Sequence, residues 1–206
     1  MSNINYGGKE FKPMLAVRYR VEQELTRNEA IKKCQNKDLA IEVYSGSGGL
    51  TKIYKSHFKE IISNDLEKDS PADYHMDAMK FIEEIVSKID KKIDLIDFDC
   101  YGSPAFVIRK FFELTKDKHF PIVVTLSDGL GIWLKRNSNM PKLKERYLLH
   151  EQFVFDERHP WREHDKLIDE MFQVIASQYN AKAEKIITVQ TKGKNYILGS
   201  WLLTNK

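Results

Sequence analysis

Short apolar runs alternate with longer amphipathic stretches along this chain, and that alternation is the feature that most restricts its fold. The expected strands are 39–44, 60–63, 74–76, 93–98, 121–126, 185–190 and 196–203. Strands that alternate with helices favour a parallel sheet covered by helices on both faces. The last two strands are joined by a short segment with Gly193 near its tip, which predicts an antiparallel C-terminal hairpin. The pattern therefore predicts an α/β fold with a mostly parallel, seven-stranded sheet.

The chain is long enough for one such unit. It has 206 residues, 42% of them hydrophobic, which suffices for a single compact core. We expect an N-terminal helical arm at 1–36, with its helix at about 17–34, and a single domain at 37–206. A polar stretch at about 135–161, rich in basic and aromatic residues, is expected to be an insertion on the carboxyl side of the sheet.

Composition limits the classes of function. The formal net charge of +3 permits a polyanionic partner without requiring one. Cys34 and Cys100 are the only cysteines, so neither a disulfide framework nor a zinc ribbon is expected, and we predict no metal site. The first residues have no apolar core of a signal peptide, and no apolar run reaches the ~20 residues of a membrane span. We therefore expect a cytoplasmic protein without membrane contact, a monomer or small homo-oligomer.

A glycine turn follows the first predicted strand, in the segment Glu-Val-Tyr-Ser-Gly-Ser-Gly-Gly at 42–49. Glycines at a strand-to-helix turn let the backbone approach a ligand closely. The third glycine of a dinucleotide fingerprint would fall at Thr51, so that motif is absent. The alternative is an ordinary loop with glycines at positive φ.

Acidic residues end the next two predicted strands. Asp65 lies about 20 residues beyond the glycines, where a carboxylate binds ribose hydroxyls, although Asn64 and Glu67 compete for that role. Asp77, with Ala78, follows the short third predicted strand and is a second acidic candidate at this edge of the sheet. Both aspartates could instead cap a helix or face solvent.

The segment Asp-Cys-Tyr-Gly-Ser-Pro at 99–104 closes the fourth predicted strand. A carboxylate beside a stiff turn can accept the hydrogens of an amine and orient it, so Asp99 is the candidate catalytic group. The ring of Tyr101 offers a stacking surface, and Gly102 and Pro104 shape a tight turn. Asp99 could instead cap the next helix. Asp97 is a second candidate carboxylate, or a residue pointing off the sheet.

This segment resembles the Asp-Pro-(Phe/Tyr)-Gly-Ser-Pro motif of the tRNA N2,N2-dimethylguanosine methyltransferases. The segment 64–66 is similar to their Asn-Asp-Ile segment, 77–78 to their Asp-Ala pair, and 42–48 to motif I of methyltransferases. The resemblance covers about 39–129, with Cys100 in place of the family's proline. It implies a Rossmann-like class I methyltransferase fold, S-adenosylmethionine as cofactor, and an exocyclic nucleobase amine in RNA, guanine N2 above all, as acceptor.

The candidate site combines these residues. The expected cofactor-binding residues are Glu42, Tyr44, Gly46, Gly48, Asp65, Leu66, Asp77 and Ala78. The expected catalytic residues are Asp99, Cys100, Tyr101 and Gly102, and the expected substrate-binding residues are Ser103, Pro104, Trp133 and Arg136.

Two other functions stay open. Cys100 could be the nucleophile of a cytosine C5 methyltransferase, since Asp97-x-x-Cys100 is similar in spacing to the Asp-x-Pro-Cys of RNA cytosine methyltransferases. The neighbouring Asp99 would weaken that thiol by raising its pKa. A catalytically inactive binding subunit on the same fold is the other alternative.

Nucleic-acid contact is expected at the basic and aromatic stretch. Its basic residues can neutralise phosphates, and its aromatic residues, Tyr147 among them, can stack on unpaired bases. A solvated, partly packed insertion explains the same composition. His150, His159 and His164 do not have the spacing of a zinc site and are expected to be scattered surface histidines.

Overall fold

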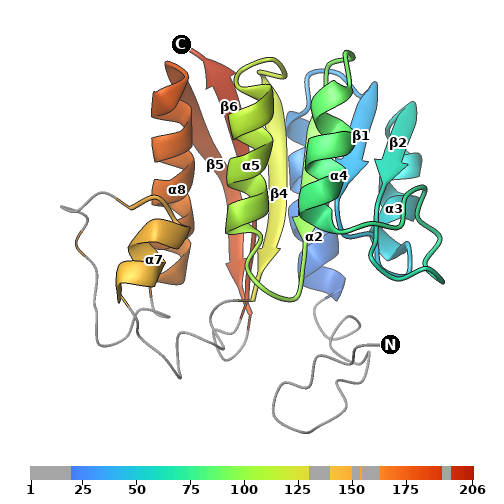
Figure 1. Ribbon diagram of the computed structural model, residues 1–206, viewed down its shortest axis with the longest axis horizontal. Helices are drawn as coiled ribbons and strands as arrows, with labels where there is room; N and C mark the ends of the chain where they lie inside the picture. Colours follow the sequence, from blue (N-terminus) through green and yellow to red (C-terminus); the bar gives the residue numbers. More distant parts are fainter. Residues whose placement is uncertain (1–19, 130–139, 150–153, 155–162, 192–195) are drawn as a thin grey trace, which may run out of the picture.

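The computed structural model describes residues 20–129, 140–149, 154, 163–191 and 196–206 (Figure 1). Its elements, in chain order, are α2 (Arg20–Lys33), β1 (Leu39–Glu42), α3 (Gly49–Lys55), β2 (Glu60–Ser63), α4 (Ala78–Glu84), the 3₁₀ helix η1 (Val86–Lys88), β3 (Leu95–Asp99), α5 (Ala105–Thr115), β4 (Ile122–Asp128), α7 (Met140–Arg146), α8 (His164–Gln178), β5 (Ala181–Gln190) and β6 (Ile197–Asn205).

Within the described residues the sheet has six strands in the order β2-β1-β3-β4-β6-β5. Strands β2, β1, β3 and β4 are parallel, and β6 runs antiparallel to both β4 and β5. The predicted C-terminal hairpin is therefore present as β5 and β6, and β6 alone runs against the other described strands. Because β6 leads to the C-terminus at the top of Figure 1, the carboxyl ends of the parallel strands lie at the bottom.

The strand expected at 74–76 does not form. Tyr74 makes only an isolated parallel bridge to Asn64. The Asp73 carboxylate accepts hydrogen bonds from the backbone N–H and the hydroxyl of Ser63, at 2.8 and 2.7 Å. The backbone N–H groups of Asp73 and Tyr74 both donate to the Ser63 carbonyl. These bonds close the segment into a loop at the end of β2, so the described sheet has six strands where seven were expected.

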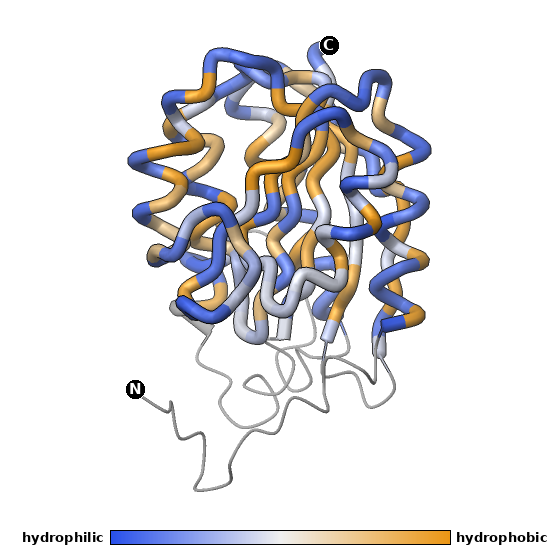
Figure 2. Tube along the Cα trace, turned by 90° about the vertical axis from the view of Figure 1, so that its right-hand side faces the viewer, coloured by the Kyte–Doolittle hydropathy of each residue, from blue (hydrophilic) through white to orange (hydrophobic). Residues whose placement is uncertain are grey.

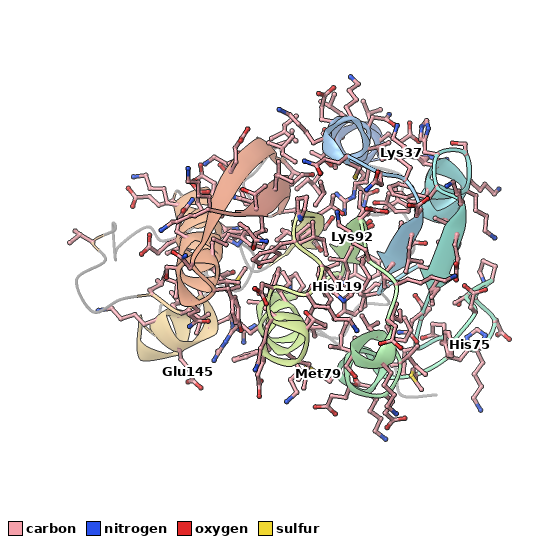
Figure 3. The ribbon with its side chains drawn as sticks, turned by 90° about the horizontal axis from the view of Figure 1, so that it is seen from above. Lys37, His75, Met79, Lys92, His119 and Glu145 are labelled. Atoms are coloured by element: carbon pink, nitrogen blue, oxygen red, sulfur yellow. The ribbon has the colours of Figure 1, made fainter. Side chains whose placement is uncertain are left out.

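Helices lie on both sides of the sheet, with α2 and α3 on one face and α4, α5 and α8 on the other (Figure 3). Alternate residues of each strand divide between two apolar clusters, as a sheet buried on both faces requires. Ala40, Leu95 and Val123 pack with α2 and α3. Their chain neighbours Ile41 and Ile96 join the larger cluster beneath α4, α5 and α8. Figure 2 shows the same arrangement, with hydrophobic strands between helices that alternate in hydropathy.

The part of the expected N-terminal arm that the structure describes is α2, and it packs directly on the sheet against β4, β5 and β6. Ala30 and Ile31 enter the core, and the Ser200 hydroxyl of β6 donates to the Thr26 carbonyl at 3.1 Å. The polar residue Arg27 lies on this same buried face. This helix therefore belongs to the layer that covers the C-terminal strands of the sheet, β4, β5 and β6.

Candidate active site

The loops after the four parallel strands meet at the carboxyl edge of the sheet. The Ser45 N–H, after β1, donates to the Asn64 carbonyl, after β2, at 2.9 Å. The Gly129 N–H, after β4, donates to the Gly102 carbonyl, after β3, at 2.7 Å. The strand ends that were singled out in the sequence are thus neighbours in space, as expected for a parallel sheet.

The glycine turn after β1 has the backbone that its sequence suggests. Gly46 and Gly48 have φ of 52° and 76°, which favours glycine at both positions. A Cβ at Gly48 would approach the Pro71 ring to 2.9 Å, whereas a Cβ at Gly46 would meet no atom within 4 Å. The backbone at Gly46 is therefore open to close approach by a ligand.

Asp65 is fixed beside this turn. Its Oδ2 accepts a hydrogen bond from the Gly46 N–H at 2.7 Å, and its Oδ1 accepts one from the Glu67 N–H at 2.9 Å. A carboxylate has about four acceptor positions. Asp65 therefore keeps capacity for two vicinal hydroxyls while its orientation is set by the backbone.

Asn64 is an internal clamp. Its buried Nδ2 donates to the carbonyls of Val43 and Met76, both at 3.1 Å, and its Oδ1 accepts from the Met76 N–H at 3.2 Å. These bonds join the end of β1 to the segment that precedes α4. The side chain is thereby occupied, which leaves Asp65 as the ribose candidate.

A cavity of about 140 Å³ opens between these loops and α5. It is lined by Tyr44, Asn64, Leu66, Met76, Asp77, Ala78, Met79 and Val107. Four of these residues were expected to bind a cofactor. A cavity of about 150 Å³ can hold one benzene ring, so this space is large enough for one ring of an aromatic base. Met79 marks the α4 side of the cavity and is labelled in Figure 3.

Asp77 is the N-cap of α4, which was the alternative role that the sequence allowed for it. Its Oδ1 accepts from the N–H groups of Met79 and Lys80 at 2.9 and 3.3 Å. Both capping bonds go to one oxygen, and the residue also lines the cavity. Capping therefore holds the carboxylate at the cavity wall.

Glu42 ends β1 and is only 1% exposed. Its Oε2 accepts a hydrogen bond from the Thr51 hydroxyl at 2.5 Å, whereas its buried Oε1 has no partner among the described residues. Burial raises the pKa of this carboxyl well above its ordinary value, and the charges of Asp97 and Asp99 add to the rise. Glu42 is therefore a buried acid that holds its proton more tightly than an exposed one.

Asp97 precedes Asp99 by two residues on β3. It forms a fully buried ion pair with Arg27 of α2. The guanidinium Nη2 and Nε lie 2.8 and 3.3 Å from the two carboxylate oxygens. The hydroxyls of Tyr54 and Thr125 also donate to this carboxylate, at 2.7 and 2.6 Å. Asp97 is therefore enclosed by four donor groups and does not point off the sheet.

Arg27 was not among the residues expected from the sequence, although its position carries a signal. Arg27 lies three and four residues before Ala30 and Ile31, so it shares their buried helix face. A charged residue on such a face requires a partner of opposite charge. Asp97, between the apolar residues Ile96 and Phe98 of β3, is that partner.

Asp99 is the last residue of β3 and faces α2. The Gln23 side-chain Nε2 donates to both of its oxygens, at 2.9 and 3.2 Å, and Arg27 Nη2 lies 3.6 Å away. Burial raises the pKa of the Asp99 carboxyl, the Arg27 charge opposes the rise, and Asp97 adds to it. The side chain is 17% exposed, and hydrogen bonds from Ser127 and Gln23 oppose the rise in pKa.

The Cys100 thiol is not an activated nucleophile. Its Sγ lies 3.8 Å from the Ser127 carbonyl oxygen. Burial raises the pKa of the thiol well above its ordinary value, and the charges of Asp128 and Asp99 raise it further. Because the thiolate is the reactive form, this environment disfavours the role of Cys100 in cytosine C5 chemistry.

The rest of the loop is held between α5 and the end of β4. Tyr101 is 64% exposed, and the charges of Asp99 and Asp65 add to burial in raising the pKa of its phenol. The Ser103 hydroxyl donates to Asp128 at 2.8 Å. Gly129 has no room for a Cβ, which would lie 2.3 Å from the Tyr101 carbonyl oxygen. The loop is therefore fixed by its backbone and by Ser103, with the Tyr101 side chain turned outward.

A second buried cluster surrounds Asp128. Besides Ser103, the Tyr147 hydroxyl lies 3.0 Å from Oδ2 and the His164 Nε2 lies 3.2 Å from Oδ1. His164, expected on the surface, is fully buried at the start of α8, and Tyr147, expected to stack on bases, is buried as well. The expectation for His164 was wrong, because its polar neighbours in the sequence concealed long-range packing. The burial of Tyr147 agrees with the alternative of a partly packed insertion. Trp133 and Arg136 lie outside the described residues.

Several solved structures share this architecture. Trm1 from Pyrococcus horikoshii, solved with S-adenosyl-L-methionine, matches 91% of this chain with a TM-score of 0.62 and 13% identity. The fold is that of the S-adenosylmethionine-dependent methyltransferases. The sequence-based resemblance to the tRNA dimethylguanosine methyltransferases is thus matched in three dimensions. This chain spans 55% of that Trm1 chain.

Two further methyltransferase structures share the fold. The plantazolicin methyltransferase BamL, solved with a triazolic desmethylPZN analogue and SAH, has a TM-score of 0.53 at 12% identity and matches 95% of this chain and 87% of its own. The N-methyltransferase NodS from Bradyrhizobium japonicum WM9 has a TM-score of 0.51 at 10% identity and matches 96% of this chain and all of its own. No protein-family model matches the sequence, and no curated protein does.

None of the described helices has the length and apolar character needed to cross a membrane. In the same part of the chain, His, Cys, Asp and Glu side chains form no group of three or more that could hold a metal ion.

Proposed function

We propose that this protein is an S-adenosylmethionine-dependent N-methyltransferase that modifies an exocyclic amine of a nucleobase in RNA, with guanine N2 as the favoured acceptor. The observation that carries the proposal is the convergence at one sheet edge of the cavity beside Ala78, the oriented carboxylate of Asp65, and the carboxylate of Asp99. These are the parts that a cofactor with an adenine, a ribose and a reactive methyl group requires, next to a group that can hold an amine.

The residues present fit this cofactor. The cavity takes an aromatic base between Leu66 and Ala78, and Asp65 is oriented to accept hydrogen bonds from ribose hydroxyls. The open backbone at Gly46 admits the portion between the ribose and the reacting centre. In Trm1 this fold was solved with S-adenosyl-L-methionine, which supports the same ligand here.

The bound cofactor would supply a methyl group on a sulfonium. Asp99 would accept an N–H of the acceptor and thereby direct the nitrogen lone pair toward that methyl carbon. As the new N–C bond forms, the C–S bond breaks, and the amine loses a proton. The raised pKa of Asp99 makes its carboxylate a better acceptor for that proton than an ordinary aspartate.

Calorimetric titration with S-adenosylmethionine and S-adenosylhomocysteine tests the cofactor site. We expect micromolar binding to the wild-type protein and loss of binding in Asp65→Ala. Asp69→Ala is the matched control, because Asp69 is an exposed aspartate in the same loop. Absence of binding to the folded wild-type protein would overturn the enzymatic proposal and favour a binding subunit.

Methyl transfer to guanine-containing RNA, detected by mass spectrometry of the nucleosides, tests the chemistry. Asp99→Asn is expected to reduce transfer at least a hundredfold, in the range typical of a lost acid–base group. Cys100→Ala is expected to retain it, since the thiol is buried with a raised pKa. Loss of activity in Cys100→Ala, with 5-methylcytosine as the wild-type product, would instead support cytosine chemistry.

A further inference from the structure

Gln23 of α2 engages the carboxylate that was assigned to the acceptor. Its Nε2 lies 2.9 Å from one oxygen of Asp99 and 3.2 Å from the other, although the two residues are 76 positions apart. A carboxamide is planar, and its nitrogen carries two hydrogens. An exocyclic amine on a heterocyclic base is also a planar N–H donor. Gln23 therefore makes the contact that the acceptor would make.

Two other side chains approach the Asp99 carboxylate, since the Ser127 hydroxyl forms a hydrogen bond with it and Arg27 lies close by. Arg27 directs its two closest guanidinium contacts to Asp97, and its approach to Asp99 is longer, at 3.6 Å. The Gln23 nitrogen is within hydrogen-bond distance of both oxygens, so this planar donor holds the outer edge of the carboxylate. Tyr101, 64% exposed, lies where its phenol responds to the charge of Asp99. Its ring can cover one face of a flat group bound at that edge.

We propose that Asp99 and Tyr101 form a subsite for a planar amino-heterocycle, such as the N1–N2 edge of guanine, and that the Gln23 carboxamide occupies this subsite until an acceptor displaces it. This inference rests on the proposed function and adds to it the residue that competes with the acceptor. Gln23 is half-buried on a helix that packs on the sheet, so it reaches Asp99 from a fixed base. Displacement requires a change in the Gln23 side chain and no movement of the strands.

The direction in which Gln23→Ala changes acceptor binding shows whether Gln23 competes with the acceptor or only supports Asp99. If Gln23 competes, Gln23→Ala removes the internal donor, and the acceptor binds more tightly by about tenfold, the factor that corresponds to one hydrogen bond to a charged group. If Gln23 only supports Asp99, the same substitution weakens binding. Alanine favours the helix at this position, so the variant is expected to fold.

The experiment is a titration with guanosine, followed by NMR, of protein saturated with S-adenosylhomocysteine. Inosine, which lacks the 2-amino group, is the matched ligand. Gln173→Ala is the matched variant, since it removes a glutamine amide that donates to the Ala183 carbonyl at 2.9 Å, far along the chain from Asp99. We expect tighter guanosine binding in Gln23→Ala, little gain for inosine, and no change in Gln173→Ala.

In ¹⁵N-labelled wild-type protein, guanosine is also expected to shift the side-chain amide resonance of Gln23. Equal or weaker guanosine binding in Gln23→Ala, or no measurable binding to that variant, would overturn the inference while leaving the cofactor site intact. Failure of S-adenosylhomocysteine to bind the wild-type protein would overturn the proposed function itself and this inference with it.

Discussion

Two buried carboxylates, Asp97 and Asp128, lie near the carboxyl edge on opposite faces of the sheet and are satisfied in different ways. Asp97 faces α2, where the Arg27 cation neutralises it and two hydroxyls complete its hydrogen bonds. Asp128 faces α5 and α8, where the Ser103 and Tyr147 hydroxyls and the His164 imidazole meet it. Among the contacts of the described residues, the first cluster is built around a guanidinium and the second around two hydroxyls and an imidazole.

The difference indicates what each cluster does. The Asp97 pair joins α2 to the middle of the sheet and thereby fixes the helix that carries Gln23. The Asp128 cluster joins α8 to the loop after β3 through the Ser103 hydroxyl. A charge pair in low dielectric is rigid and costly to break, whereas hydrogen bonds of a single carboxylate can be removed one at a time. We therefore expect the first cluster to govern stability and the second to govern the geometry of the loop.

The largest expected effect is that of Arg27→Met. This substitution leaves the Asp97 carboxylate buried without its cation, and such losses cost about 3–5 kcal/mol of unfolding free energy. Urea denaturation measures the cost. The double variant Arg27→Met with Asp97→Leu removes both charges and is expected to recover most of it. If Arg27→Met lowers the unfolding free energy by less than about 1 kcal/mol, the Arg27 charge does not stabilise the buried Asp97 carboxylate.

Glu42 adds a pH-dependent test of the same face. The folded pKa of its carboxyl is raised well above 4.5, chiefly by burial. Above pH 4.5 the unfolded chain releases this proton while the folded chain keeps it, so the wild-type protein loses stability as pH rises through the folded pKa. Glu42→Gln is expected to be more stable than the wild type at pH 8 and equal to it at pH 4. Denaturation at both pH values measures the difference, and a pH-independent difference would contradict the assigned protonation.

The tyrosines Tyr54 and Tyr147 allow a matched comparison of the two clusters. Both are fully buried, and each hydroxyl meets a carboxylate, at 2.7 Å from Asp97 and 3.0 Å from Asp128. Replacement of either by Phe is expected to cost about 1–3 kcal/mol. Only Tyr147→Phe should also reduce methyl transfer beyond its effect on stability, because Asp128 holds Ser103. Equal kcat losses in both variants would remove the functional distinction between the clusters.

The serines give the smallest effect. Ser103→Ala removes the hydroxyl that donates to Asp128. Ser127→Ala removes the hydroxyl that accepts from Arg27 in the Asp97 cluster. Each should cost about 1 kcal/mol in denaturation. Ser103→Ala is expected to lower kcat with little change in S-adenosylmethionine affinity. If kcat is unchanged in Ser103→Ala, the loop is positioned by its backbone alone.

The local sequence pattern was sufficient to predict the bounds of elements that are flanked by turn residues. The strand at 60–63 was predicted with its observed bounds, and the helix after Pro104 begins at Ala105 as expected. The segment at 74–76 was wrong as a strand, because the Asp73 side chain and the Ser63 backbone close a loop there, and such side-chain bonds have no periodic signature.

The sequence by itself determined that polar and glycine residues follow successive strands, and a parallel sheet necessarily brings those ends to one edge. The positions of Asp65, Asp77 and Asp99 near that edge could therefore be predicted in advance. Only the tertiary structure decided which side chains face them. Gln23 and Arg27 meet β3 from about 70 positions away, and His164 is buried against Asp128 by α8. Such partners are selected by the packing of helices on the two sheet faces, which depends on the whole core and not on any one segment.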